Sequence, residues 1–210
     1  METDPQHVRR VVLPKSINSD VFIVGQALGS STQRLSGIPY CFPDGQLSRT
    51  GAKLDRFLNR FGYTINPRSS FRRAYSSDIV QRYPGPARGG DRKPTRAEVS
   101  NCSGWLQQEM RLVRPKVVIL VGSLAGREFL RQYAATPLVD RASRFWGQPQ
   151  LCLVERFRLI AFPVPHFAYR YGALPSDQIY RSVARKIRNL LETAPQSTAA
   201  TSAKSTRLLR

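Results

Sequence analysis

The chain has 210 residues, of which 33 are Lys or Arg and 14 are Asp or Glu, and its formal net charge is +19. This length suits one well-buried domain and is short for two. A basic excess of this size indicates a polyanionic partner such as DNA, because Lys and Arg neutralise phosphates and release counterions. The alternative is a coding bias that replaces Lys by Arg, since only six of the basic residues are Lys.

The composition also argues against several other classes of protein. Cys41, Cys102 and Cys152 are widely spaced and form no CxxC pair, so neither a disulfide framework nor a zinc site is predicted. No apolar run approaches the roughly 18 residues of a membrane span, and residues 1–10 contain no apolar signal-peptide core. We therefore expect a cytoplasmic protein that binds neither a membrane nor a metal.

The N-terminal part of the chain predicts one strand and one helix. Residues 1–19 are polar and form the expected lead-in, and residues 21–25 are a short β-branched run that is typical of a buried strand. A turn-rich stretch covers residues 26–49. Thr50 is the expected N-cap of the helix that follows. The apolar residues of this helix recur at helical spacing, at Leu54, Phe57, Leu58 and Phe61.

The middle of the chain predicts a second strand, a basic loop and a long helix. The strand covers residues 75–80, and a Gly- and Pro-rich loop follows over residues 84–90. Thr95 and Glu98 have the spacing of a capping box. The helix that they start is expected to end before Pro115.

The clearest strand signal is the run KVVILVG over residues 116–122, which is typical of a central strand in a parallel sheet. Ser123 is expected to cap the next helix, and two short strands are predicted near residues 151–154 and 158–163. The last helix carries an apolar stripe, formed by Ile179, Val183, Ile187 and Leu190.

Strands that alternate with amphipathic helices predict a three-layer α/β/α sandwich around a mostly parallel four-stranded sheet. The domain is expected over residues 20–194, followed by a disordered basic tail over residues 195–210. Ligands of such sheets bind beyond the carboxyl ends of the strands. The loops after Val24, Val80 and Val164 are therefore the expected site.

These loops also carry motifs of a known type. Residues 21–29 (VFIVGQALG) and 37–40 (GIPY) are similar to a strand that runs into Gly-Glu-Ala-Pro-Gly and then Gly-x-Pro-Phe. Residues 75–80 (YSSDIV) resemble the strand Tyr-Ile-Thr-Asn-Val-Val.

Three further stretches follow in the same order. Residues 94–98 (PTRAE) and 114–122 (RPKVVILVG) match the helix start Pro-Thr-x-x-Glu and the strand RPKVIVALG closely. Residues 162–166 (FPVPH) stand where that pattern has a strand ending in His-Pro-Ser. Over about residues 20–190, the chain thus resembles the uracil-DNA glycosylase superfamily.

The resemblance implies a monofunctional DNA glycosylase, which flips a base out of DNA and hydrolyses its N-glycosidic bond to leave an abasic site. His166 would donate a hydrogen bond to the base as the bond breaks, and Tyr40 would stack on the base, with Gly25 and Ala27 beside it. The alternative for His166 is an ordinary loop histidine, and the alternative for Tyr40 is a core aromatic near a turn.

The residue that activates the water is left open by the resemblance. Gln26 occupies the position of a catalytic Glu in one branch of the family, and its amide could orient a water molecule. Asp44 lies close to where another branch places a catalytic Asp. The alternative for Asp44 is a Pro-Asp-Gly turn. The missing carboxylate also keeps a non-catalytic DNA-binding relative as a competing hypothesis.

Asp78 replaces the family's Asn, and this change points to another base. An ionised Asp only accepts hydrogen bonds, so it suits an amino group such as cytosine N4 rather than uracil O4. Small residues at 29–32 leave room near the C5 position of the base. These features predict excision of a 5-modified cytosine, as found in phage DNA, and hence antiviral defence. The alternatives are uracil excision in DNA repair, and an Asp78 that caps or pairs with an Arg.

Two basic or aromatic loops are expected to contact DNA, and the chain is expected to act as a monomer. No cofactor is predicted, because hydrolysis needs only water. In one branch of the family four cysteines hold an iron–sulfur cluster, but here only Cys102 matches, Arg82 stands at a second position and the N-terminal pair is missing. The residues expected to contact DNA are Arg82, Arg88, Arg92 and Lys93 in one loop, and Phe167, Tyr169 and Arg170 in the other.

Overall fold

The computed structural model describes residues 18–30, 32–88, 90–136, 142–168 and 176–193. Its centre is a five-stranded sheet in the order β4-β1-β7-β9-β8. Four strands are parallel, and β8 joins the edge antiparallel to β9. The mostly parallel sheet is confirmed, but it has five strands rather than four, because the strand predicted near residues 151–154 joins its edge. The strands are β1 (Val21–Ala27), β4 (Tyr75–Val80), β7 (Val117–Val121), β8 (Gln150–Val154) and β9 (Phe157–Val164).

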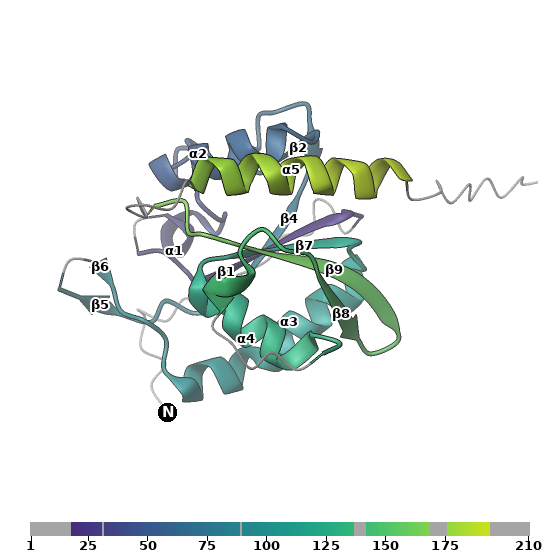
Figure 1. The fold of residues 1–210 in the computed structure, drawn as a ribbon. Coiled ribbons are helices and arrows are strands. Elements are labelled where there is room, and N and C mark those ends of the chain that lie inside the picture. Colours follow the sequence, from purple (N-terminus) through teal and green to yellow (C-terminus); the bar gives the residue numbers. More distant parts are fainter. Residues whose placement is uncertain (1–17, 31, 89, 137–141, 169–175, 194–210) are drawn as a thin grey trace, which may run out of the picture.

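Helices cover both faces of this sheet, which gives the predicted three layers (Figure 1). One face carries α2 (Arg49–Asn59) and α5 (Ser176–Thr193), and the other carries α3 (Arg96–Val113) and α4 (Ser123–Tyr133). The smaller elements are α1 (Gln33–Ser36), the 3₁₀ helix η1 (Ala142–Phe145), the pair β2 (Tyr63–Thr64) with β3 (Arg72–Arg73), and the hairpin β5 (Pro86–Ala87) with β6 (Gly90–Asp91).

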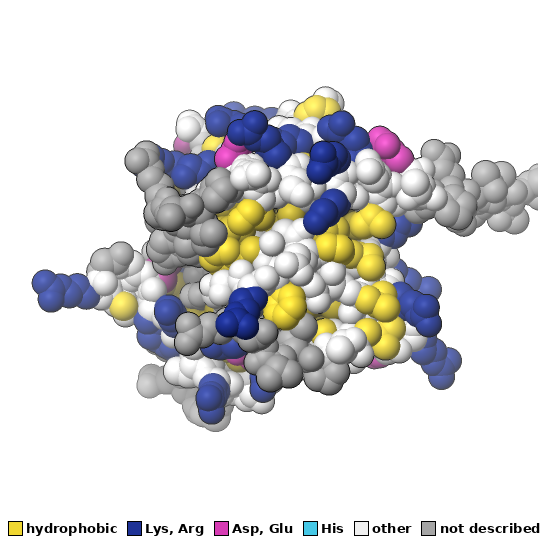
Figure 2. Space-filling view, in the orientation of Figure 1, with side chains coloured by type: hydrophobic (Ala, Val, Ile, Leu, Met, Phe, Trp, Pro, Cys, Tyr) yellow, Lys and Arg dark blue, Asp and Glu magenta, His cyan; other side chains and the backbone are white. Residues whose placement is uncertain are grey.

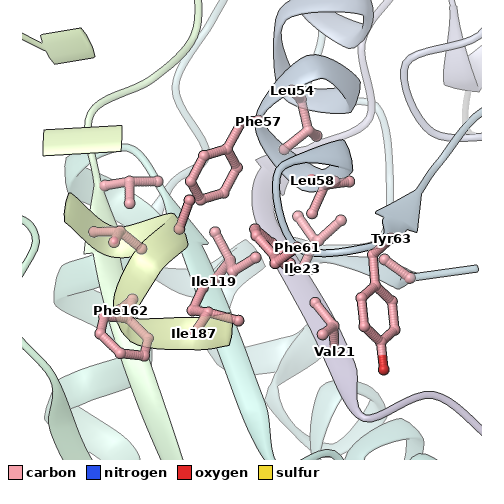
Figure 3. Close-up of a cluster of buried hydrophobic side chains, with 14 of the residues drawn as sticks. Val21, Ile23, Leu54, Phe57, Leu58, Phe61, Tyr63, Ile119, Phe162 and Ile187 are labelled. Carbon is pink, nitrogen blue, oxygen red and sulfur yellow. The ribbon is translucent and has the colours of Figure 1, made fainter. Parts of the chain in front are cut away.

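Alternation along the central strands builds two hydrophobic cores. Side chains of a strand point to opposite faces in turn, so Val21 and Ile23 pack with α2 and α5 while Phe22 and Val24 pack with α3 and α4. Figure 3 shows the first core, in which aromatic and aliphatic side chains of α2 meet the strands. Because both of its faces are buried, β7 is continuously apolar and was recognisable in the sequence.

Two expected helix caps differ from the structure. The N-cap of α2 is Ser48 rather than Thr50, and its hydroxyl accepts the N–H of Gly51 at 3.1 Å. The N-cap of α4 is Gly122, so Ser123 is the first helical residue and makes no side-chain cap. Gly122 has a φ of +90°, which favours glycine at this cap position, and it lies next to the His166 side chain.

The capping box of α3 is confirmed. Thr95 accepts the N–H of Glu98 at 3.2 Å, and Glu98 accepts the N–H of Thr95 at 2.7 Å. Arg92 binds both oxygens of Glu98, at 2.8 and 2.6 Å. These bonds, that to Arg92 above all, lower the pKa of Glu98 to about 2.

Replacing Thr95 by Ala is expected to lower the free energy of unfolding by about 1 kcal/mol, the usual cost of a lost N-cap. Urea unfolding at neutral pH measures the change, and Thr95→Ser, which keeps the hydroxyl, is the matched control. The ionised Glu98 side chain also contributes to the free energy of unfolding, and this contribution depends on pH. Since folding depresses its pKa from 4.5 to about 2, that contribution is full above pH 4.5 and is lost as the pH falls toward 2. A Thr95→Ala protein as stable as the parent would contradict this account.

Within the part of the chain that the structure describes, no helix combines the length and the apolar character needed to cross a membrane.

Candidate active site

A cavity of about 700 Å³ opens at the carboxyl ends of the parallel strands, at the edge of the sheet where Figure 1 shows α1 and the β5–β6 hairpin. A second hollow, of about 740 Å³, lies between α3 and the β8–β9 hairpin and is lined by none of the predicted site residues. We therefore assign the site to the first cavity. The predicted residues that line it are Gln26, Ala27, Tyr40, Asp78, Lys93 and His166.

Elements other than the three predicted loops also line the cavity. The turn between β7 and α4 also lines it, through Gly122, Ser123 and Leu124, and so does the start of α2, through Ser48 and Thr50. The sequence did not single out these walls, because β7 and its helix follow each other without a long loop.

Gly25 is buried on β1 and, unlike the neighbouring Gln26 and Ala27, is not among the residues that line the cavity. Its partner in the parallel register is Asp78 on β4. A Cβ atom on Gly25 would lie 2.3 Å from Oδ1 of Asp78 and 3.2 Å from the hydroxyl of Tyr40. Only glycine therefore lets the carboxylate and the phenol approach the β1 backbone together.

Tyr40 is held by the first turn of α2. Its backbone has a φ of +61°, which is unusual for a residue with a side chain. The carbonyl of Tyr40 accepts the N–H of Ser48 at 2.8 Å. A Cβ atom on Gly51 would lie 2.7 Å from that carbonyl oxygen and 2.8 Å from Cβ of Tyr40. The position of the aromatic ring thus depends on a glycine in the adjoining helix.

Asp78 is 4% exposed, and its Oδ2 accepts a hydrogen bond of 2.8 Å from Nε2 of Gln33. Gln33 comes from the short helix α1, is 5% exposed and also lines the cavity. Gln33 was not predicted as a site residue, because no motif includes it and the surrounding residues indicate only turns. The described bond to Asp78 comes from a neutral amide.

His166 follows β9 and is a hydrogen-bond donor through Nε2. Its Nδ1 accepts the N–H of Ala168 at 3.2 Å. An accepting ring nitrogen carries no proton, so the proton of the neutral imidazole is on Nε2. Burial lowers the pKa of His166 below its ordinary value of 6.5. The side chain is therefore neutral at pH 7 and still able to donate.

Two predicted site residues lie elsewhere. Asp44 is exposed, its Oδ1 accepts the N–H of Gln46 at 2.9 Å, and it is not among the residues that line the cavity. This is the turn geometry that the sequence offered as the alternative. Phe167 is only 3% exposed and stacks on Tyr180 in the core with a centroid distance of 4.6 Å. Its predicted insertion into DNA is therefore corrected.

The residues expected to contact DNA backbone differ in exposure. Arg82, Arg88 and Lys93 are exposed, and Lys93 also reaches the cavity. Arg92 is bonded to Glu98 at the start of α3, so we assign it a structural role instead. In the view of Figure 2, Lys and Arg side chains are spread over the surface, including the end of the projecting β5–β6 hairpin. Tyr169 and Arg170 lie outside the described residues.

The β5–β6 hairpin is fastened beside the cavity. Asp91, on β6, accepts the backbone N–H of Ser30 at 3.2 Å. The guanidinium of Arg34 lies over the ring of Tyr83, 4.9 Å from its centroid. The first contact joins the hairpin to the loop that follows β1, and the second joins α1 to the segment before the hairpin. The basic residues Lys93 and Arg127 line the cavity beside them.

The cysteines do not fit an iron–sulfur cluster. Cys41, Cys102 and Cys152 are all buried and free, and burial raises the pKa of Cys152 to about 12. Such a cluster requires four ligands, one more than the cysteines of this chain. Among the described residues, no three His, Cys, Asp or Glu side chains gather as a metal site.

Comparison with known proteins agrees with this geometry. A family model of the uracil DNA glycosylase superfamily matches residues 14–187. Over 44 residues the chain is 48% identical to a type-5 uracil-DNA glycosylase of Pyrobaculum aerophilum. That stretch is 21% of this chain and 20% of the relative, so it spans a fifth of the relative's length. On the strength of the family match, which covers most of the sequence and the whole sheet, the chain belongs to the uracil DNA glycosylase superfamily.

Proposed function

We propose that the protein is a monofunctional DNA glycosylase. It flips a base out of DNA, hydrolyses the N-glycosidic bond and leaves an abasic site. The observation that carries this proposal is that Tyr40 and His166 line one and the same cavity at the carboxyl ends of the strands. An aromatic face and a neutral donor are what an extrahelical base requires.

The chemistry divides between the sugar and the leaving base. As the bond between C1′ and the base breaks, the sugar becomes oxocarbenium-like and the base becomes anionic. His166 donates from Nε2 to the base carbonyl and stabilises that anion. Tyr40 stacks on the base, and the amide of Gln26 orients the water that adds to C1′. Asp44 takes no part, because it lies outside the cavity.

The base class follows from Asp78. Its carboxylate accepts hydrogen bonds and matches the amino group of a cytosine-type base. Gly29, which has no side chain, and the small residue Thr32 line the same cavity, and they leave space for a substituent at C5. We therefore propose 5-modified cytosines as substrates, with removal of modified phage bases as the biological role.

Uracil excision is the second candidate, and the named relative is the observation that favours it. The P. aerophilum protein is a type-5 uracil-DNA glycosylase, and it is 48% identical to this chain in the matched stretch. In that case Asp78 would serve to hold the strand ends rather than to recognise an amino group.

End-labelled duplexes test these proposals. Each duplex carries uracil, a thymine mismatch, cytosine or 5-hydroxymethylcytosine, and hot alkali cleaves the abasic strand after a single turnover. We expect cleavage at 5-hydroxymethylcytosine, whereas cleavage at uracil alone would select the second candidate. Asp44→Ala is the matched control and should keep the parental rate. Salt-sensitive binding without cleavage of any duplex would indicate a non-catalytic DNA-binding protein and would overturn the proposal.

Gly51→Ala is expected to slow base release by about 10- to 100-fold, since a misplacement of about 1 Å at a reacting centre has effects of this size. The added methyl group would meet the backbone of Tyr40 and force the aromatic ring to shift. Single-turnover alkali cleavage measures the rate. Gly104→Ala is the matched control, because a Cβ atom there meets nothing within 4 Å. Parental activity in Gly51→Ala would show that the position of Tyr40 does not matter.

A further inference from the structure

Gln33 is a buried polar residue that the proposed chemistry does not yet use. It is 5% exposed and lies on α1, outside every family motif described above. A side chain of this type is usually exposed, so its burial calls for a partner. That partner is Asp78, whose Oδ2 accepts from Nε2 of Gln33 at 2.8 Å.

The short helix holds Gln33 in place. The carbonyl of Gln33 accepts the N–H of Gly37 at 2.9 Å, and the N–H of Arg34 donates to the carbonyl of Gly29 at 3.2 Å. Arg34 in turn lies over the ring of Tyr83. The amide is thus presented to Asp78 by a tied backbone rather than by a free loop.

The bond has a chemical consequence for Asp78. A carboxylate that is 4% exposed loses most of its hydration, and burial favours the neutral acid. A donated hydrogen bond favours the ionised form instead. The neutral acid carries an O–H donor and would suit a base carbonyl such as uracil O4. The ionised form only accepts, so it suits a base amino group and opposes a base carbonyl.

We propose that Gln33 is a positioning residue that keeps Asp78 ionised and acceptor-only, and thereby sets the preference of the cavity for an amino-bearing base. This inference rests on the proposed function. It adds a residue that determines specificity by acting through another residue, with no contact of its own to the base required.

Other charged and titratable groups face the same cavity, and the effect of their titration on the rates must be distinguished from that of Asp78. His166 is neutral at pH 7 because burial lowers its pKa. A ratio of rates for two substrates of one variant cancels any titration that affects both substrates equally. The groups that share the cavity are Tyr40, Asp91, Lys93, Arg127 and His166, and Glu109 of α3 lies behind β4, where it bonds to Ser77.

The variant Gln33→Met removes the donor at similar volume, and Gln33→Glu places a second carboxyl group beside Asp78. Two adjacent carboxyl groups share a proton. Gln81→Met is the matched control, because Nε2 of Gln81 also donates to a carboxylate, Glu109 at 2.9 Å, and Gln81 does not line the cavity. Circular dichroism checks that each variant folds.

The first readout is the ratio of cleavage rates for 5-hydroxymethylcytosine and uracil duplexes between about pH 8 and about pH 5.5. We expect this ratio to fall at least about tenfold toward acid in both Gln33 variants. The reason is that the ratio of ionised to protonated carboxyl group falls tenfold with each pH unit. The ratio of cleavage rates should stay within about twofold in the parent and in Gln81→Met. A ratio in Gln33→Met that is as flat as in the control would overturn the inference.

The second readout needs no catalysis. Carbon-13 NMR of labelled Asp side chains follows the ionisation of Asp78, with Asp78→Asn identifying its signal. We expect the titration midpoint of Asp78 to rise by about one pH unit or more in Gln33→Met. An unchanged midpoint overturns the inference whether or not the protein cleaves DNA. An unreactive parent protein with a raised midpoint in the variant would overturn the proposed function alone.

Discussion

Replacing His166 by Ala is expected to slow base release by about 10²- to 10³-fold, the usual cost of removing one donor to a developing anion. The reason lies in the geometry of the imidazole. Ala168 donates to Nδ1, so the ring offers a proton from Nε2 at the moment when the base gains negative charge. Alanine removes that proton donor and leaves the stacking surface of Tyr40 in place.

Single-turnover alkali cleavage measures this effect, and His166→Gln, which keeps an N–H donor, should lose less. Folding is expected to persist in both variants. A fully active His166→Ala protein would remove His166 from the mechanism.

The pH dependence of the same step follows from burial. Because burial lowers the pKa of His166 below 6.5, the neutral donor persists as the pH falls through 6.5. Loss of activity through protonation of His166 should therefore begin at a lower pH than for an exposed histidine. The contribution of the neutral His166 to the free energy of unfolding also depends on pH. It is present above pH 6.5 and declines as the pH falls toward the lower pKa of the folded state.

Asp78→Asn is expected to invert the preference between bases, by about 10- to 100-fold in the ratio of rates for uracil and 5-hydroxymethylcytosine. Each well-placed base contact discriminates by about 1–3 kcal/mol. Asparagine has nearly the same shape as aspartate and can still accept from Gln33 through its carbonyl. Its amide N–H₂ then adds a donor that suits a base carbonyl and opposes a base amino group.

The ratio is measured on both duplexes under identical conditions. Asp91→Asn is the matched control, because Asp91 also lines the cavity but is exposed and bonded to the Ser30 backbone. It should leave the ratio close to the parental value. If Asp78→Asn preserves the parental ratio, Asp78 does not recognise the base.

Much of the framework could be predicted from local sequence. The strand over residues 117–121 is apolar at every position because both of its faces are buried. The Thr95 and Glu98 cap depends on residues three apart in the chain, and it formed as expected. Local signals of this kind need no knowledge of distant contacts.

The errors arose where distant parts of the chain decide the outcome. Gln33 is buried because Asp78, 45 residues away, needs a donor. Phe167 faces the core because Phe57 and Tyr180 offer an aromatic surface, at centroid distances of 5.6 and 4.6 Å. Nothing within the motif itself distinguishes such an aromatic from one that inserts into DNA. Asp44 satisfies its own turn, and its distance from the cavity depends on how the 41–47 loop closes.

The central claim is that a neutral His166 donates from Nε2 to a base held in the Tyr40 cavity. Nitrogen-15 NMR of histidine-labelled protein tests it directly, since the chain contains only two histidines and His166→Ala identifies the signal. We expect the Nε2–H tautomer at neutral pH, and a shift of that signal on binding a duplex whose modified cytidine carries a cleavage-resistant 2′-fluoro sugar. A charged imidazolium at neutral pH, or a His166 signal that the bound duplex leaves unchanged, would contradict the account.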